Sequence, residues 1–503
     1  MGIPFNPLDR TKPLVDQLVS QVMARVGQDP AATGARLPSI RGLAVELGVN
    51  RNTVAQAYKE LAQKGYLDSR FGGGSTLRRP GDPGAAPAAA RRFDHLDWER
   101  RFAGHFAAFA LPAAPPARDG GEPPVNLFQL HPHTGLFPLD AFRLCLNTVL
   151  RRQGRALLNY GSPAGYLPLR ERIAARLKRQ RIPVTPAQIL VTSGSQQGID
   201  LLARAFLNPG DGVVVESPMY SIALKIFQMN GAALIPYAVG PGGVSLAGLE
   251  SALGRNAPKL FYAVPNFQNP TAHSYTGAEK QALLAQVYRT GGLLIEDASD
   301  AELHRDAESR PALAALDGLT QTLHLNTFSK TLVPAVRVGY LAGPAPVMHR
   351  LTELKEMTDL SHSLILQAAI SEFMERGLFD RHVAAVRDFY RARMELAVEM
   401  LEQALPEEAP FARPGGGLCT WVDLPPQVDT AQLYRQLAQA GVLVSPGALY
   451  QPVPGGRNGL RLCVAAEPEE RLRRGIAILG AELRRLLSGR VRPPAIREYQ
   501  SIH

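Results

Sequence analysis

The segment TLHLNTFSK, residues 322–330, is a short, largely apolar run that ends in Thr, Ser and Lys. Four further segments are short, largely apolar runs: QILVTSG at 188–194, GVVVESP at 212–218, KLFYAVP at 259–265 and GLLIEDA at 292–298; all but KLFYAVP have polar residues near the carboxyl end. Runs of this length bounded by turn residues indicate buried strands, and the sequence between them has helical periodicity. The alternation predicts an α/β domain with a largely parallel sheet over about residues 124–490.

Upstream of this domain, residues 11–79 have the pattern of three helices followed by a hairpin. Apolar residues three or four apart over 14–26 indicate the first helix. Ser39 and Asn50 each precede an apolar-periodic segment, so they are candidate N-caps of the second and third helices. The stretch YLDSRFGGGSTLRR, residues 66–79, predicts two strands joined by a glycine tip.

Composition and charge limit the functions that the chain can have. A length of 503 residues indicates more than one domain, and residues 80–123, rich in Ala, Pro, Gly and Arg, predict a linker. Residues 1–80 hold eleven Lys or Arg against six Asp or Glu, a net +5 of the chain's +10. A basic small domain is typical of a polyanion-binding protein, although an arginine-rich proteome also produces basic domains.

The compartment is indicated by what the sequence lacks. The chain has no apolar run of about 18 residues and no apolar core of a signal peptide near its start, so we expect no membrane partner. Cys145, Cys419 and Cys463 are far apart and have neither metal-ligand nor disulfide spacing. We therefore expect a cytoplasmic protein without a metal site.

Residues 37–76, LPSIRGLAVELGVNRNTVAQAYKELAQKGYLDSRFGGGST, resemble the winged helix-turn-helix of the GntR family of regulators. The resemblance implies a double-stranded DNA operator as partner; the alternative is a basic helical bundle used for protein contacts. In a helix-turn-helix, side chains at the amino end of the second helix contact base edges, and flanking arginines contact phosphates. A glycine at the tip lets the wing approach a groove. The residues expected to contact DNA are Arg36, Arg41, Arg51, Asn52, Thr53 and Gly73.

The larger domain resembles the fold-type I aminotransferases of class I/II. Eight fragments carry the resemblance in order: NYGSPAGYLPLRERIA, VTSGSQQGIDL, ESPMY, VPNFQNPTA, IEDASDAEL, NTFSKTLVPAVRVGY, GGGLCTWVDLP and NGLRLCVA. Joined to the winged helix, the chain is similar to the MocR subgroup of GntR regulators. The resemblance implies pyridoxal 5'-phosphate as cofactor, a homodimer, and a small C-terminal α+β subdomain over about 380–490.

The resemblance also assigns the groups that would hold the cofactor. Lys330 matches the lysine that forms the Schiff base, a role that needs an amine on a turn at the end of a strand. Asp297 matches the carboxylate that keeps the pyridine nitrogen protonated; an Asp that closes a strand can also be a helix cap. Phosphate binding needs several donors at a helix amino terminus. The matching residues are Gly194, Ser195, Gln196, Thr327, Ser329 and Arg337.

Four further residues match family positions around the ring and the substrate. Tyr160 would reach the phosphate of the neighbouring subunit, and Tyr220 would stack on the ring. Asn269 would bind the phenolic oxygen, and Arg461 would hold a carboxylate of the substrate or effector with two donors. Without the resemblance, Tyr220 is also consistent with a core aromatic and Arg461 with a surface salt bridge.

The sequence departs from the family pattern at three positions. A tyrosine is expected two or three residues after the pyridine-binding Asp, where this chain has Ser299 and Asp300, and Ala272 replaces the glycine of an NPTG turn. A carboxylate near the imine would raise its pKa. We therefore expect cofactor binding with slow transamination.

Three functions are consistent with these patterns. The first is a regulator that senses an amino compound or the cofactor itself. The second is an aminotransferase with an accessory winged helix. The third is a DNA-binding protein whose large domain serves as a dimerisation scaffold.

Overall fold

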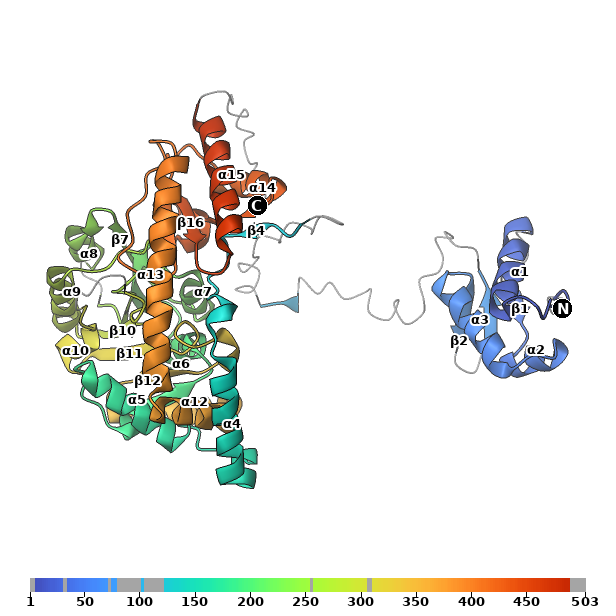
Figure 1. Cartoon of the computed structure of the whole chain (residues 1–503), viewed down its shortest axis with the longest axis horizontal. Helices are drawn as coiled ribbons and strands as arrows, with labels where there is room; N and C mark the ends of the chain where they lie inside the picture. The colour runs from blue at the N-terminus through green and yellow to red at the C-terminus, as the bar shows by residue number, and fades with distance from the viewer. Residues whose placement is uncertain are drawn as a thin grey trace. The chain divides into compact units, whose positions relative to one another are not determined.

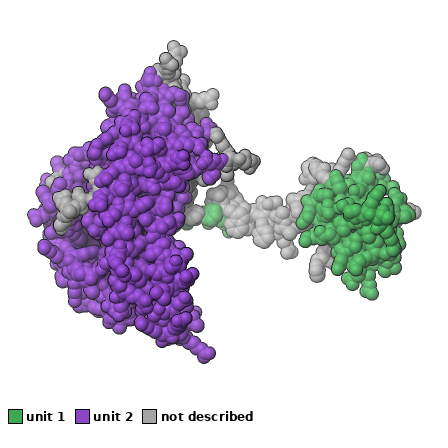
Figure 2. Space-filling model, in the orientation of Figure 1, with its two compact units in different colours: residues 1–107 green, residues 108–503 purple. Residues whose placement is uncertain are grey.

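The computed structural model describes residues 5–29, 34–70, 74–78, 101–103, 122–253, 257–304 and 310–488. The chain divides into two compact units, residues 1–107 and 108–503 (Figure 2). Of the expected linker 80–123, the structure describes residues 101–103 and 122–123.

The first unit is a winged helix. Its elements are α1 (Leu14–Gln28), β1 (Arg36–Leu37), α2 (Ile40–Glu46), α3 (Arg51–Gln63), β2 (Leu67–Arg70) and β3 (Gly74–Leu77). The side chains of Ser39 and Asn50 accept hydrogen bonds from the amides of Gly42 and Asn52, which confirms both as N-caps. Strand β3 pairs antiparallel with both β2 and β1, so a third strand that the sequence did not indicate completes the wing sheet.

A single sheet is the centre of the second unit (Figure 1). Its order is β5 (Ile189–Thr192), β12 (Gly339–Ala342), β11 (Thr322–Thr327), β10 (Leu293–Asp297), β9 (Leu260–Ala263), β6 (Gly212–Ser217), β7 (Ala233–Gly240) and β8 (Gly243–Val244). Strands β12 and β8 pair antiparallel with their neighbours, and the remaining pairs are parallel. All five strands that the sequence indicated belong to this sheet, and it is largely parallel as expected.

Helices bury both faces of the sheet, which is why the strand sequences are apolar at consecutive positions. Val213 and Val215 pack with one group of helices, whereas Val214 between them packs with another. The first face is covered by α6 (Ser195–Phe206), α7 (Ser221–Met229) and α11 (Ala345–Asp359). The other face packs against α4 (Leu139–Gln153), α5 (Leu167–Arg179), α8 (Leu246–Leu253), α9 (Gly277–Thr290), α10 (Leu313–Asp317) and α12 (Leu364–Glu375).

A smaller core includes the C-terminal half of the long helix α13 (Leu378–Ala404; Figure 1). Its further elements are β13 (Cys419–Asp423), α14 (Thr430–Gln439), β14 (Val442–Leu443), β15 (Ser445–Pro446), β16 (Gly459–Cys463) and α15 (Glu469–Leu487). Strand β4 (Val125–Asn126) pairs with β14, and Val125 is buried in the same core. The part expected over 380–490 thus shares its core with residues far upstream. None of the described helices combines the length and apolar character needed to cross a membrane.

Candidate functional site

A cavity of about 430 Å³ opens at the carboxyl ends of the parallel strands. This edge is where open α/β sheets bind ligands, because loops from several strands converge there. Most residues that the resemblance singled out line the cavity: Ser195, Gln196, Tyr220, Asn269, Asp297, Thr327, Ser329, Lys330, Arg337 and Arg461. The segment 128–131 and Tyr450 also line it, and the sequence did not indicate them.

Asp297, the last residue of β10, is a buried carboxylate with several donors. The Tyr262 hydroxyl donates to Oδ2 at 2.8 Å, and the Ser299 hydroxyl and amide donate to Oδ1 at 2.5 and 3.0 Å. Burial raises the pKa of Asp297, and the hydrogen bonds from Ser299 and Tyr262 act in the opposite direction. Three donors on a buried carboxylate favour its ionised form, which a protonated ring nitrogen needs as its partner.

Lys330 follows β11 on a turn, and its half-buried side chain reaches the cavity. Its Nζ donates to the carbonyl oxygen of Leu130 at 2.6 Å, across 200 residues of sequence. Burial and the nearby Lys330 charge lower the pKa of His131, which also lines the cavity. The hydrogen-bond partner of the Lys330 amine is thus a neutral backbone carbonyl.

Donors for an anion gather where α6 begins. Gly194 caps the helix with φ 82° and ψ 175°, a conformation that is essentially restricted to glycine. A Cβ on Gly194 would lie 2.8 Å from Nη2 of Arg337, so the absence of a side chain leaves room for the guanidinium. Thr327 and Ser329 are buried beside each other, with their hydroxyl oxygens 3.0 Å apart. The helix dipole and these donors together suit a phosphate group.

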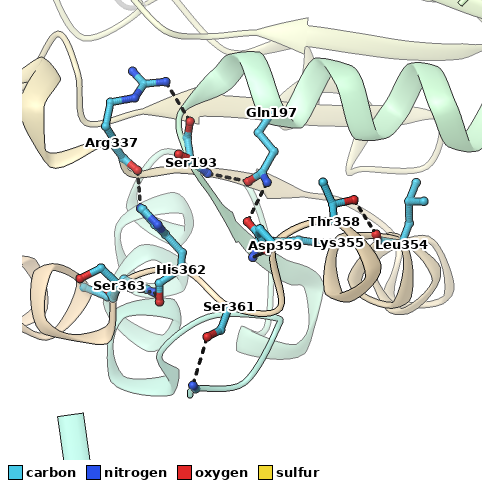
Figure 3. A network of polar contacts seen from close by, with 12 residues as sticks. Ser193, Gln197, Arg337, Leu354, Lys355, Thr358, Asp359, Ser361, His362 and Ser363 are labelled. Atoms are coloured by element: carbon cyan, nitrogen blue, oxygen red, sulfur yellow. Dashed lines mark hydrogen bonds and ion pairs between the residues drawn. The ribbon is translucent and has the colours of Figure 1, made fainter. Parts of the chain in front are cut away.

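A hydrogen-bond network connects this anion-binding corner with residues of α11 (Figure 3). Arg337 donates to the Ser193 carbonyl at 2.9 Å, and the Ser193 amide donates to Gln197 at 2.7 Å. Gln197 in turn donates to Asp359 at 2.7 Å, and the buried Lys355 is paired with the same carboxylate at 2.8 Å. The network therefore connects the start of α6 with the end of α11.

Arg461 and Asn269 form the opposite wall of the cavity. Nη1 of Arg461 donates to the side-chain oxygen of Asn269 at 3.1 Å, and Nη2 donates to the Phe128 carbonyl. The guanidinium lies 5.2 Å from the centre of the Tyr450 ring, and its Nε has no hydrogen-bond partner. Arg461 is buried, so it is not the surface salt bridge that the sequence left open.

Two of the three departures from the family pattern have a structural explanation. Ala272 has φ 59°, so the left-handed turn is kept without the glycine, and its amide donates to the Gln268 carbonyl. Ser299 donates to Asp297 and thus serves the ring-nitrogen carboxylate. Asp300 is 5% exposed, and its Oδ1 has no hydrogen-bond partner.

Tyr160 does not line the cavity of its own chain. Its side chain is 80% exposed, and apolar side chains in the same part of the sequence, Leu139, Leu144 and Leu158, are more than half exposed. Gly161 donates its amide to the Ser361 hydroxyl, and the next residue, His362, contacts the Arg337 carbonyl through its ring (Figure 3). The position of Tyr160 is consistent with a residue that acts on a second subunit.

The candidate DNA-binding residues lie on the first unit. Arg36, Arg41, Arg51 and Asn52 are exposed, and Thr53 is half-buried. Gln56 and Lys59 are also exposed on α3, one and two turns after Asn52, and sequence reasoning missed them although their spacing puts them on that face. Gly73 lies outside the described residues.

The sequence did not reveal two residues that contribute to the site: Leu130, which lines the cavity, and Tyr262, which is fully buried and donates to Asp297. Tyr262 lies inside the apolar strand β9 and is indistinguishable there from a core aromatic. Leu130 contributes a carbonyl oxygen, which every residue has. Lys225 could have been found from the sequence, because it lies one helical turn after Ser221 on α7. Both residues line the cavity.

The groups present fit a phosphorylated pyridine aldehyde. They supply an amine at Lys330, a buried carboxylate at Asp297, a ring-sized aromatic at Tyr220 and an anion-binding corner at Gly194 and Arg337. The cradle at Gly194 that a Cβ would fill is specific evidence of fit, because glycine is needed there for both space and backbone conformation.

Two family models match the chain. The model of the bacterial regulatory proteins of the gntR family matches residues 14–77, and the model of aminotransferase class I and II matches residues 135–479. The second match covers more than half of the chain.

Individual proteins are similar to the chain over most of its length. The uncharacterized HTH-type transcriptional regulator YdfD of Bacillus subtilis is 29% identical, with 97% of this chain and 100% of YdfD covered. The probable rhizopine catabolism regulatory protein MocR of Rhizobium meliloti is 28% identical, with 87% of each covered. The crystal structure of LysN, an alpha-aminoadipate aminotransferase of Thermus thermophilus complexed with N-(5'-phosphopyridoxyl)-L-leucine, has a TM-score of 0.72 and 29% identity, with 78% of this chain and 100% of LysN covered. The chain therefore belongs to the aminotransferase class I and II family and joins that domain to a gntR-family DNA-binding domain, as the MocR-type transcription regulators do.

Proposed function

We propose that this regulator binds pyridoxal 5'-phosphate in the cavity at Lys330 and senses an amino compound there. The observation that carries the proposal is the cavity itself, in which an amine, a donor-rich carboxylate and an anion-binding corner converge in a chain that also has a winged helix. The cofactor would supply an aldehyde that reacts with amines and a ring that accepts electrons. A chromosomal DNA partner implies the cytoplasm.

Each cavity residue has a distinct task in this proposal. Lys330 provides the amine that attaches the cofactor, and Asp297 holds the protonated ring nitrogen. Tyr220 stacks on the ring, and Asn269 binds the phenolic oxygen. Arg461 lines the cavity, and its Nε has no hydrogen-bond partner. Its guanidinium would bind a carboxylate of the effector.

The phosphate has its own set of donors. The amides at the start of α6, the hydroxyls of Thr327 and Ser329, and Arg337 face it from one side. Tyr160 of a second subunit completes the set in a homodimer, and the exposed apolar residues Leu139, Leu144 and Leu158 support such an interface.

Effector binding changes DNA affinity through a difference in free energy. An amino compound that binds one arrangement of the dimer more tightly than another shifts the population toward it. The DNA affinity then changes by the same coupling factor, typically between about five- and 150-fold. The test is DNA affinity of the holoprotein with and without a panel of amino acids and amines. A panel that alters the visible absorbance of the bound cofactor but never the DNA affinity would contradict the proposal.

The DNA-binding surface has a test of its own. Arg51→Ala should relax the sequence preference on fragments selected from a random library, because this arginine lies at the amino end of α3. Arg41→Ala should weaken all fragments similarly and reduce the salt slope by about one. Lys64→Ala is the matched control, since it removes the same charge at the other end of α3, where Lys64 is paired with Glu60. Equal effects of all three variants would rule out this orientation of the helix.

A second candidate function is an aminotransferase with an accessory winged helix. The Arg461 and Asn269 contact favours it, because these groups would orient a substrate carboxylate beside the cofactor. Steady-state turnover of a common amino donor at about 1–1000 per second would establish this candidate and displace the sensor. We expect slower turnover, since Asp300 places a carboxyl group in the cavity where a hydroxyl was expected.

A further inference from the structure

Asp300 is the acidic side chain of the cavity whose hydrogen bonding is incomplete. It lies three residues after Asp297, is 5% exposed and lines the cavity. Its Oδ1 is buried without a partner, and within the described part of the chain no cation lies within ion-pair distance of the carboxylate. A buried carboxyl group without donors is costly, so such groups in native proteins normally have a partner or a function.

The other charged groups near Asp300 have partners in the protein. Asp297 accepts from Tyr262 and Ser299, Lys330 donates to Leu130, and Arg461 donates to Asn269 and Phe128. Burial raises the pKa of Asp300. The charges of Lys330 and Arg461 act to lower this pKa, and that of Asp297 acts to raise it. Asp300 lines the same cavity as the Lys330 amine that holds the cofactor and the Arg461 guanidinium proposed to hold a carboxylate.

We propose that Asp300 binds a second, cationic nitrogen of the effector, which is then an amino acid with two amino groups. The proposal rests on the proposed function, because it assumes that the first amino group of the effector meets the cofactor at Lys330. The second ammonium donates to the unpartnered Oδ1 and balances the buried charge.

The arrangement of charges selects for this class of ligand. An effector carboxylate faces Arg461, and the second ammonium faces Asp300, so a diamino acid satisfies both walls of the cavity at once. A monoamino acid leaves Asp300 without a donor, and an acidic side chain would place two carboxylates together. Lys225 also lines the cavity and could attract an acidic side chain of a ligand. It is half-buried, so water screens part of its charge.

The test uses amino acids of equal length that differ in their terminal group. L-lysine, L-norleucine and L-2-aminoadipate form one set, and L-ornithine, L-norvaline and L-glutamate form a shorter one. Affinity for the full-length holoprotein is measured by calorimetry and by the change in visible absorbance of the bound cofactor. We expect the diamino member of at least one set to bind roughly thirtyfold or more tightly than its neutral counterpart.

Variants then assign the preference to one residue. Asp300→Asn keeps the shape of the side chain and should abolish the advantage of the diamino acid over its neutral counterpart, so the ratio of the two affinities falls to about one. Asp300→Ser provides the same comparison if the amide disturbs folding. Asp388→Asn, the same change at an exposed position paired with Arg391, should keep the wild-type ratio.

The outcomes separate this inference from the proposed function. Tighter binding of the neutral or acidic member in both sets overturns the role of Asp300, even if ligands still alter DNA affinity. A diamino preference that survives in both Asp300 variants overturns it as well. The absence of binding by all six amino acids overturns the inference together with the sensor proposal.

Discussion

Replacing Gly194 by alanine should weaken phosphate binding through one displaced guanidinium. The added Cβ would lie 2.8 Å from Nη2 of Arg337, closer than real Cβ contacts allow, so the arginine must move. Movement breaks its 2.9 Å hydrogen bond to the Ser193 carbonyl and its proposed ion pair with the phosphate. A hydrogen bond to a charged group contributes about 1.5–3 kcal/mol. At about 1.4 kcal/mol per factor of ten, cofactor affinity should fall roughly ten- to a hundredfold.

The assay compares two forms of the cofactor. Binding of pyridoxal 5'-phosphate and of pyridoxal, which lacks the phosphate, is followed by visible absorbance of the apoprotein. Gly194→Ala should weaken only the phosphorylated form, because the ring contacts at Asp297 and Tyr220 are unchanged. The substitution also costs about 1–3 kcal/mol of stability, since φ 82° with ψ 175° is strained for any L side chain.

Gly210→Ala is the matched control for backbone strain. Gly210 has φ 90°, and a Cβ there would meet nothing within 4 Å. This variant should lose stability in urea unfolding and keep the affinity for both cofactor forms. Equal loss of pyridoxal and pyridoxal phosphate affinity in Gly194→Ala would refute the reasoning, as would wild-type affinity for both.

Three further predictions concern Lys330, Tyr262 and Glu216. Lys330→Ala should remove the visible absorbance of the attached cofactor and leave the fold intact by circular dichroism; a borohydride-fixed adduct in this variant would disprove the assignment. Tyr262→Phe removes one of the donors that stabilise ionised Asp297, worth about 1.5–3 kcal/mol. It should therefore raise the pKa of the Asp297 carboxyl further and move the acid limit of cofactor binding upward; an unchanged limit contradicts this. Burial raises the pKa of Glu216 to about 7, so the folded chain binds a proton that the unfolded chain releases, and stability should fall as the pH rises from about 4.5 through 7. Glu216→Gln should flatten this part of the urea-unfolding profile, and an unaltered slope would exclude Glu216 as its source.

Local patterns predicted the elements that carry the site. The strands 189–192, 212–217, 260–263, 293–297 and 322–327 lie within the expected segments, because continuous apolar runs suit a sheet covered on both faces. Strand β12 was not indicated; it follows β11 after residues 328–338, which include a 3-10 helix at Pro334–Val336, and it runs antiparallel to β11. Pairing direction depends on how the connection folds back, which a single apolar run does not specify.

The residues of the site also divide into those that the sequence indicated and those that it did not. Lys330 and Asp297 were indicated because their chemistry requires particular side chains at the ends of strands. Tyr262 was missed because its hydroxyl matters only next to the Asp297 carboxylate, which lies on a neighbouring strand. The sequence showed Ser299 only as a departure from the expected tyrosine, and the structure adds that its hydroxyl bonds to Asp297.

By itself, the sequence determined the two-domain organisation, the helices of the winged helix, five strands of the central sheet, and the chemical types of the groups expected to bind DNA or cofactor. These properties depend on periodicity, caps and residue type within a few positions of the chain. Only the tertiary structure decided that Lys330 meets the Leu130 carbonyl, that Arg461 meets Asn269, and that Oδ1 of Asp300 is left without a hydrogen-bond partner. Such contacts join residues up to 200 positions apart, and apolar patterning specifies that a face is buried without specifying which distant segment buries it.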